Sequence, residues 1–449
     1  MNQSGDNHYL SLPQKNNPKK VAIATMTGTT IEYFDNYIYA MATVLVFSEQ
    51  FFDHSDPVAS QIAALYTFAV NLLARPVGAM LFGHYGDTLG RKNALVISLL
   101  LMGVSTVVIG LLPTYASIGV WATVLLFLCR TLQGIGLGGE WGGAALVALE
   151  NAPQSKRGLF TAFPQLGAAL GLFLANLVFL GLALGLGKEA VSAWAWRLPF
   201  IASACLVMIG LYVRLTLQES AVFDHAKNQD KLHKLPIKQI FTTHKVPFFK
   251  AILIAIIGYV QFYMVVIFGQ IYAKSSTQLS DFGHAQGLGL PSEQFTMALL
   301  FGAVVFAISI VAAGHLCDKL GRKTVLIAST SLIGVFGLCL PMLLAQDGLV
   351  YQAVGLYGFI GIGMVLLGAN FGPMAVILPE LFATQVRYLG ASLGFTLAGI
   401  LGASVATIVA IKLNAQFGLI GVGCYMLVNA VLSLIGLLMV RETKQTTLT

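Results

Sequence analysis

Charged residues are scarce in this chain of 449 residues. Lysine, arginine, aspartate and glutamate together make up 10% of it, whereas hydrophobic residues make up 57%. A soluble globular domain carries about 25% charged residues. The composition therefore excludes an ordinary soluble protein and indicates a protein of the lipid bilayer.

Patterns typical of enzymes, metal sites and disulfide frameworks are also missing. The five cysteines are odd in number and widely spaced, which fits neither disulfide pairing nor metal ligation. We find no Ser/His/Asp arrangement and no phosphate-binding loop, so we expect no enzyme, no cofactor and no bound metal. The net charge of +7 is not gathered on a basic stretch interleaved with aromatic residues, which argues against a nucleic-acid partner.

Twelve apolar runs are each long enough to supply the roughly 20 residues that cross about 30 Å of hydrocarbon. They lack the period-two alternation of β-barrel strands, so they predict an all-α membrane protein with twelve transmembrane helices. The runs lie at residues 21–47, 58–82, 93–112, 119–149, 158–184, 193–213, 251–273, 295–314, 324–345, 349–378, 388–411 and 417–440.

A decapeptide occurs twice, as GHYGDTLGRK at 83–92 and as GHLCDKLGRK at 314–323, with seven of ten positions identical. Each copy is a charged turn between two apolar runs. An internal repeat of this kind predicts two pseudo-symmetric six-helix halves. We expect an N-terminal tail, a first half, a charged linker, a second half and a C-terminal tail at residues 1–20, 21–217, 218–247, 248–441 and 442–449.

The distribution of basic residues predicts the orientation. Of the 26 lysines and arginines, 20 fall in the tails and in the turns on one side, whereas the opposite loops hold Lys188, Lys274 and Lys412. The positive-inside rule then places both termini in the cytoplasm. The first apolar run lacks a cleavage site, so it is read as a retained span. We expect a multi-pass protein of the plasma membrane.

A second repeated pattern accompanies the decapeptide, because Glu150 is followed by Arg157 at the spacing that separates Glu380 from Arg387. These charges could form ion pairs, and an aspartate of each decapeptide could lie at a helix N-terminus of the facing half. The alternative is an ordinary solvated turn, which the duplication argues against. The predicted cytoplasmic gate consists of the ion pairs Arg91 with Glu150 and Arg322 with Glu380, together with Asp87, Asp318, Arg157 and Arg387.

Six ionisable residues lie inside the predicted spans, all in the first half. Each costs at least about 2.5–3.5 kcal/mol at the bilayer centre, so each is a candidate functional residue. We expect Glu32, Asp35 and Glu140 to carry protons, and the alternative is a set of structural ion pairs with Glu140 held by Arg75 or Arg130. The six are Glu32, Asp35, Arg75, Arg130, Glu140 and Arg197.

Substrate contacts are expected from two arginines and from uncharged polar side chains. Arg75 and Arg130 could attract a carboxylate, and the second half, which has no charge within its spans, offers tyrosine and amide groups that orient a small polar molecule. The alternative for each uncharged residue is core packing or an interfacial belt. The uncharged candidates are Tyr39, Gln133, Gln165, Tyr259, Gln261, Tyr263 and Asn370.

Several motifs resemble those of a known family. They are GTTIEYFD at 28–35, ARPVG at 74–78, RTLQG at 130–134, GGEWGG at 138–143, WRLPF at 196–200 and LPELF at 378–382, with VRY at 386–388. Together with the repeated turns, they resemble the metabolite:proton symporters of the major facilitator superfamily, with transporters of α-ketoglutarate, citrate, shikimate and proline or betaine. Two positions depart from the pattern: Tyr33 replaces the usual tryptophan, and Asn36 follows Asp35.

The resemblance implies proton-coupled uptake of a small organic acid or zwitterion. Two halves would expose a central site alternately to each side of the membrane, and the carrier would work as a monomer whose partners are its substrate, protons and the lipid bilayer. Two alternatives stay open, a proton-independent facilitator on the same fold and a transport-inactive nutrient sensor.

Overall fold

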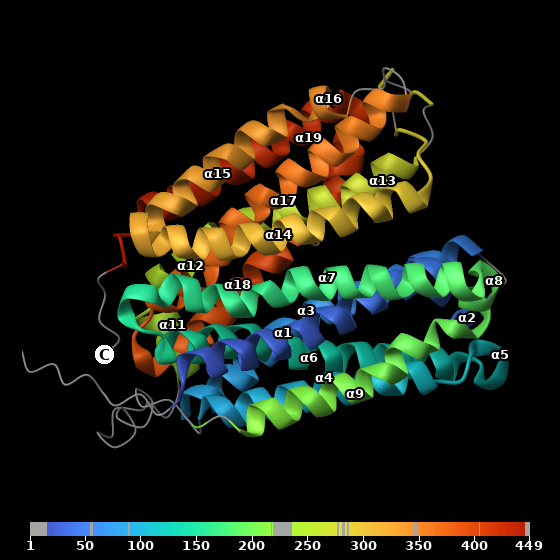
Figure 1. Cartoon of the computed structure of the whole chain (residues 1–449). Coiled ribbons are helices and arrows are strands. Elements are labelled where there is room, and N and C mark those ends of the chain that lie inside the picture. Colours follow the sequence, from blue (N-terminus) through green and yellow to red (C-terminus); the bar gives the residue numbers. More distant parts are fainter. Residues whose placement is uncertain are drawn as a thin grey trace, which may run out of the picture.

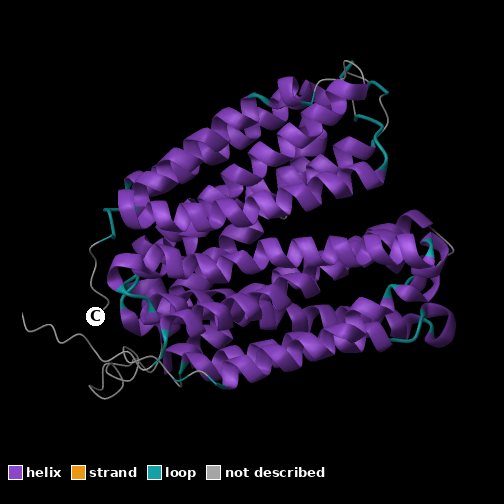
Figure 2. Cartoon of the chain, viewed as in Figure 1, coloured by secondary structure: helices purple, strands orange, loops and turns teal. Residues whose placement is uncertain are grey.

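The computed structural model describes residues 16–53, 57–88, 90–216, 218, 236–275, 278–280, 283–284, 287–344, 349–403 and 405–444. Nearly all of this described chain is helical (Figure 2). The greater part of the predicted N-terminal tail, linker and C-terminal tail, at residues 1–15, 219–235 and 445–449, lies outside the described residues.

The first half is a bundle of six long helices. Short helical turns join them at η1 (Thr43–Phe47), α2 (Ser48–Gln50), α5 (Tyr115–Ile118), η2 (Gln154–Lys156), α8 (Lys188–Ala190) and η3 (Val191–Ala195). The long helices are α1 (Pro18–Ala42), α3 (Pro57–Thr88), α4 (Arg91–Leu111), α6 (Val120–Asn151), α7 (Arg157–Leu186) and α9 (Arg197–Leu215).

The second half repeats this arrangement. Its short elements are α11 (Pro236–Thr242), α16 (Leu340–Leu343) and η5 (Thr384–Val386). One span is built from α12 (Lys245–Phe262), η4 (Tyr263–Phe268) and α13 (Gly269–Lys274) in succession. The other long helices are α14 (Ser292–Leu320), α15 (Arg322–Leu338), α17 (Leu349–Glu380), α18 (Arg387–Ala403) and α19 (Ala406–Leu438).

Helix α19 contains the end of one crossing and the whole of the next, because its backbone leaves the helical conformation at Gly418. This glycine has a φ of 67°, a left-handed conformation that a side chain disfavours. The residues before it continue α18, and those after it form the last crossing. Counted this way, the described residues contain the twelve predicted spans.

Length and hydropathy alone identify eight stretches of the described chain as membrane-crossing helices, one of which, Thr384–Leu438, covers the last two spans. Outside these stretches lie α15, which has only 17 residues, and α1 and α3, which carry buried polar and charged side chains.

Several helix boundaries differ from the apolar runs. Helix α1 begins at Pro18, where Asn17 caps it by accepting a hydrogen bond from the Lys19 N–H at 3.0 Å. Helix α12 begins at Lys245, inside the predicted linker. Both helix starts carry lysines. A lysine lowers the hydropathy of a run, but at a helix end its ammonium group can reach the polar headgroup region.

The two bundles lie side by side, and four helices make the largest contacts between them (Figure 1). In the contact between halves, α3 packs on α18 and α14 packs on α7. Each half thus contributes its second and fifth spans, as pseudo-twofold symmetry requires. Both ends of the described chain, at Asn16 and Lys444, lie at the end of the molecule that carries the repeated turns; we call it the terminal face.

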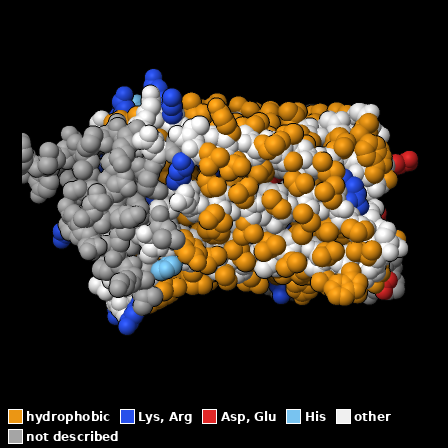
Figure 3. Space-filling view, turned by 90° about the horizontal axis from the view of Figure 1, so that it is seen from below, with side chains coloured by type: hydrophobic (Ala, Val, Ile, Leu, Met, Phe, Trp, Pro, Cys, Tyr) orange, Lys and Arg blue, Asp and Glu red, His pale blue; other side chains and the backbone are white. Residues whose placement is uncertain are grey.

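The outer surface between the two ends is apolar. Large hydrophobic side chains such as Leu73, Met208 and Ile308 are more than 60% exposed, and Figure 3 shows a broad hydrophobic belt with basic side chains gathered toward the terminal face. A belt of this size is stable only in lipid. The chain is a multi-pass membrane protein.

Candidate functional site

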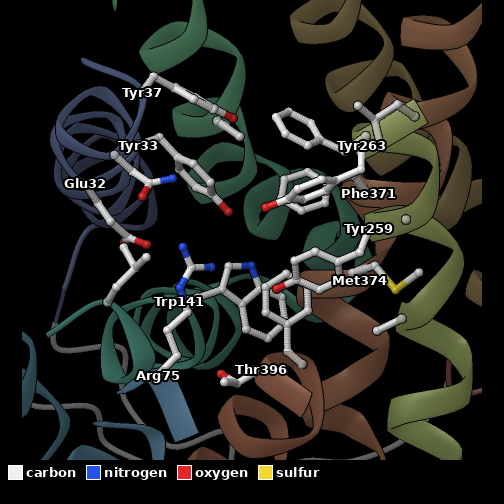
Figure 4. Close-up of a pocket in the computed structure, with 18 of the residues that line it drawn as sticks. Glu32, Tyr33, Tyr37, Arg75, Trp141, Tyr259, Tyr263, Phe371, Met374 and Thr396 are labelled. Atoms are coloured by element: carbon white, nitrogen blue, oxygen red, sulfur yellow. The ribbon is translucent and has the colours of Figure 1, made fainter. Parts of the chain in front are cut away.

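A cavity with about 870 Å³ of empty space, its opening included, lies between the two halves. The first half lines it from α1, α3, α6 and α7, and the second half from α12, η4, α14, α17 and α18. Figure 4 shows side chains of both halves pointing into this space. A small molecule bound here would contact both halves.

Glu32 of α1 and Arg75 of α3 are the charged side chains among the described residues that line the cavity. In Figure 4 the Glu32 carboxylate and the Arg75 guanidinium turn toward one another. Glu32 is 2% exposed, yet among the described residues its Oε2 atom has no hydrogen-bond partner, and neither has Arg75 Nε. Arg75 donates one hydrogen bond, from Nη2 to Asn71 Oδ1 at 3.2 Å. Both charged groups therefore keep unused bonding capacity that faces the cavity.

Aromatic rings form most of the remaining wall. Trp141 of α6 stacks on Phe395 of α18, with centroids 3.6 Å apart and planes within 10°, and Tyr37 of α1 stacks on Phe262 of α12 at 6.1 Å. The hydroxyls of Tyr259 and Tyr263 point into the cavity beside Arg75 (Figure 4). Apolar walls with a few polar groups are typical of sites for small molecules.

Asp35 lies in a second, smaller pocket of about 170 Å³ beside the cavity. It accepts hydrogen bonds from the hydroxyls of Thr106, at 2.7 Å, and Ser203. Gln133 donates to Thr106 at 2.7 Å and accepts from Arg130 at 2.9 Å. A chain of polar groups thus connects this carboxylate to the guanidinium.

The charged residues that the sequence predicts as one site are divided between the cavity and this second pocket. Glu32 lines the cavity, whereas Asp35 and Arg130 line only the pocket. The Arg130 guanidinium lies 3.5 Å above the ring of Tyr39, an arrangement that stabilises a buried cation. Arg130 is therefore held beside the cavity, not inside it.

Glu140 is paired with Arg214, an arginine that the sequence analysis had assigned to a cytoplasmic turn. The guanidinium donates to both carboxylate oxygens, at 2.9 Å to Oε2 and by a shorter bond to Oε1, and Ser98 donates to Oε2 at 3.0 Å. Glu140 is thus held by an arginine, as one alternative predicted, but by Arg214 and not by Arg75 or Arg130. Arg214 follows the last apolar run of the first half by one residue, so hydropathy alone assigns it to the turn outside the span.

The uncharged candidates divide into two groups. Tyr259 and Tyr263 line the cavity and Gln133 lines the smaller pocket, whereas the other four lie outside both. Those four make internal hydrogen bonds. Tyr39 donates to Thr67, Gln165 bridges Trp141 Nε1 and the Phe371 carbonyl, Gln261 donates to the Gly363 carbonyl, and Asn370 donates to Thr330.

Arg197, the remaining charge within a predicted span, completes a helix end. Its Nη1 atom donates to the carbonyls of Gly110 and Leu112, at 2.9 and 2.7 Å, at the C-terminus of α4. Its guanidinium carbon lies 4.6 Å from the ring centre of Trp196. A cation at a helix C-terminus is favourable, so this arginine has a structural explanation.

At the terminal face, each of the two repeated aspartates accepts hydrogen bonds from the opposite half. Asp87 of α3 accepts the backbone N–H groups of Tyr388 and Leu389, at 3.2 and 3.0 Å, in the first turn of α18. Asp318 of α14 accepts those of Gly158 and Leu159, at 2.8 and 2.9 Å, in the first turn of α7. Each aspartate thus lies at the N-terminus of a helix in the facing half.

The predicted ion pairs surround these bonds. Arg91 pairs with Glu150, and Arg322 Nε lies 3.6 Å from Glu380 Oε2. Arg387 of the second half approaches Glu150 of the first at 3.8 Å, while Arg157 of the first half interacts electrostatically with Glu380 of the second. The hydroxyl of Tyr388 adds a bond to the Gly139 carbonyl at 2.8 Å. The halves are closed against each other at this end.

The sequence profile of the Major Facilitator Superfamily matches residues 25–407. A Haemophilus influenzae protein whose name assigns it to metabolite transport is 58% identical over 430 residues, which cover 96% of this chain and 95% of that protein. The chain belongs to the major facilitator superfamily. It is a membrane transporter and not an enzyme.

Other members of the superfamily extend this comparison. The inner membrane metabolite transport protein YhjE of Escherichia coli K12 is 45% identical, with 96% of each chain covered, and the shikimate transporter of the same organism is 30% identical, with 95% of each covered. The structure of the proton:xylose symporter XylE bound to 6-bromo-6-deoxy-D-glucose gives a TM-score of 0.75 at 16% identity and covers 96% of this chain and 97% of its own. At 16% identity this similarity shows a shared fold and no more.

Sequence reasoning missed several cavity residues of this major facilitator protein. Tyr33, Tyr37, Trp141, Phe262 and Phe395 were not proposed as site residues, although three of them are adjacent to residues that were. A signal existed for Tyr33 and Tyr37, because they lie four residues apart and so share one face of the helix. For the phenylalanines no sequence signal separates a cavity wall from ordinary packing.

Proposed function

We propose that this protein is a proton-coupled symporter that takes up a small organic acid or zwitterion by alternating access. The observation that carries the proposal is the pair of opposed, incompletely bonded charges, Glu32 and Arg75, in the cavity between the halves. The unused donors of Arg75 suit a substrate carboxylate. The unused acceptor of Glu32 suits a proton.

Glu32 is the first candidate for the coupling proton. An ionised carboxylate buried without a hydrogen-bonding or salt-bridging partner is costly, and Glu32 forms no ion pair among the described residues. Proton binding removes that cost and favours a state in which the cavity is closed to water. Asp35 is the second candidate, although its two hydroxyl donors stabilise the ionised form. Glu140 is disfavoured because Arg214 already neutralises it.

The repeated turns form the gate of the proposed cycle. We place the terminal face in the cytoplasm, since the basic residues gather there and the positive-inside rule applies, and we place the carrier as a monomer in the bacterial inner membrane. The described conformation is then closed toward the cytoplasm. Opening that side requires the bonds of Asp87 and Asp318 to break together with the contacts of Arg387 with Glu150 and of Arg157 with Glu380.

The proposal can be tested with the purified protein in liposomes. We would screen carboxylates, shikimate-like acids and betaine for uptake while a trapped dye follows lumenal pH. Substrate-driven acidification of the lumen is expected, Glu32→Gln should abolish it, and Arg75→Gln should weaken substrate binding by about tenfold or more. Glu189→Gln, on the exposed α8, is the matched control. Uptake without any change in lumenal pH would replace the proposal by a proton-independent facilitator, and binding without uptake would replace it by a sensor.

A further inference from the structure

Arg214, in the last turn of α9, is a buried cation that the mechanism above does not use. It is 3% exposed. Its guanidinium donates to both oxygens of Glu140 and, through Nη1, to the Leu95 carbonyl at 2.5 Å. It therefore lies within the packed interior of the first half, between α4, α6 and α9.

The same guanidinium lies against α1, directly beside the helical turn that precedes Glu32. A Cβ atom on Gly28 would overlap Arg214 Nη2, so this glycine leaves the space that the guanidinium occupies. Gly28 and Glu32 are four residues apart and share one face of α1, with a rise of about 6 Å between them. Arg214 is thus within about one helical turn of Glu32 while it is bonded to Glu140.

Arg214 is a cation that lies between two acids, Glu32 and Glu140. Glu32 faces Arg75 from α3, Arg214 from α9 and Asp35 on its own helix. Arg214 faces Glu32 from α1, Glu140 from α6 and Tyr388 from α18. Tyrosines complete the surroundings of Glu32. They are Tyr33 and Tyr37 of α1 and Tyr259 of α12.

We propose that Arg214 is a positioning residue for proton coupling, a single counterion for which Glu32 and Glu140 compete. The inference rests on the proposed role of Glu32 as proton acceptor. With a proton on Glu32, Arg214 stays on Glu140, as observed. When Glu32 releases its proton, the new carboxylate draws the guanidinium toward α1 and leaves Glu140 with Ser98 as its remaining partner.

This exchange reaches the closed gate through α6. The residue before Glu140 is Gly139, whose carbonyl accepts the Tyr388 hydroxyl from the opposite half. The backbone N–H of Tyr388 is in turn bonded to Asp87. A shift of α6 that follows the loss of the Arg214 contact therefore acts on the same residue that the gate aspartate holds.

Infrared spectroscopy of the full-length protein in lipid vesicles tests the inference without a substrate. A protonated carboxyl group has its own C=O stretching band, and the band lost in Glu32→Gln identifies Glu32. Its pH midpoint is then measured in Glu140→Gln and in the doubly neutral variant Arg214→Gln/Glu140→Gln. Arg197→Gln, at the other end of the same helix, is the matched control.

Competition predicts midpoint shifts of opposite sign. Glu140→Gln releases Arg214 to Glu32 and should lower the midpoint by about one pH unit, whereas the double variant removes the cation and should raise it by about one unit. A pair with only a structural role leaves the double variant unchanged, because its two charges cancel at Glu32, and that result overturns the inference while the proposed symport stands.

Two further outcomes are decisive. A pH-dependent band that Glu32→Gln leaves intact would remove Glu32 as the proton acceptor and the inference with it. If the double variant does not fold, the single variants Arg214→Lys and Glu140→Gln test the competition instead. The first keeps the cation and should leave the midpoint within a few tenths of a pH unit, and the second should still lower it. A raised or unchanged midpoint in Glu140→Gln rejects the competition.

Discussion

Asp87 and Asp318 make the same contact in opposite directions across the interface between the halves. Each carboxylate accepts two backbone N–H groups from the first turn of a helix in the facing half. Those N–H groups have no partner within their own helix, and the helix N-terminus carries a partial positive charge. The duplicated turn thus becomes a symmetric pair of bonds that hold the terminal face closed.

Replacing either aspartate should open that face. In Asp87→Asn and Asp318→Asn, the new amide NH₂ group confronts a backbone N–H, which leaves one donor unsatisfied at a cost of about 1–3 kcal/mol. We expect faster reaction of a cavity cysteine, introduced as Thr396→Cys, with a membrane-impermeant thiol reagent added from the terminal face. Glu189→Gln is the control. Equal reaction rates in all variants would contradict the gate role.

Closure should also depend on Gly142, which lies at the contact of α6 with α18. A Cβ atom there would overlap Ser392 Oγ of the opposite half, and overpacking of this kind costs about 1–3 kcal/mol. Gly142→Ala should therefore slow transport by about tenfold or more by disfavouring the closed state. Gly181→Ala has no neighbour within 4 Å and should be silent. A normal rate in Gly142→Ala would show that the halves need not approach so closely.

Arg75 and Arg130 should differ in their effect on substrate binding. Arg75 lines the cavity with an unpartnered Nε atom, so Arg75→Gln should weaken binding of the transported carboxylate by about tenfold or more, as expected for a lost charged hydrogen bond of about 1.5–3 kcal/mol. Arg130→Gln should alter the affinity far less. Isothermal titration of each variant with the substrate found in the uptake screen measures both effects, and equal losses would place Arg130 in the binding site.

Arg197 should matter for stability and not for coupling. Arg197→Ala removes the two hydrogen bonds that complete the C-terminus of α4 and should destabilise the protein by about 1–2 kcal/mol. Thermal unfolding in detergent would record this loss. The number of protons taken up per substrate should not change. Altered coupling in a variant that remains folded would assign this arginine a part in transport.

The repeated turns are the part of the site that sequence predicted best. Their contacts depend on residues that lie at fixed offsets from helix ends, and pseudo-symmetry brings each turn to the facing half. The pair Arg91 with Glu150 could be predicted for that reason. The depth shared by Glu32 and Arg75 could also be predicted, because the rise per residue of a helix fixes how far each lies from the membrane surface.

The rotation of each helix was beyond such reasoning. Gln261 and Asn370 were credible substrate ligands by composition, yet both turn into helix contacts, because packing against neighbours decides which face meets the cavity. Trp141 shows the converse, since it becomes a cavity wall through its stack with Phe395 of the other half. No local pattern specifies a partner that far along the chain.

The sequence by itself determined the membrane crossings, the two halves and the paired turns. Apolar length and the bilayer leave a helix as the structure in which these runs satisfy their backbone. The tertiary structure decided which charges meet. Arg214 reads as a basic residue at a helix end, and only the packing of α9 on α4, with Gly28 open beside it, buries that cation between Glu140 and Glu32. Burial depends on neighbours from the whole bundle, which a single sequence does not bring together.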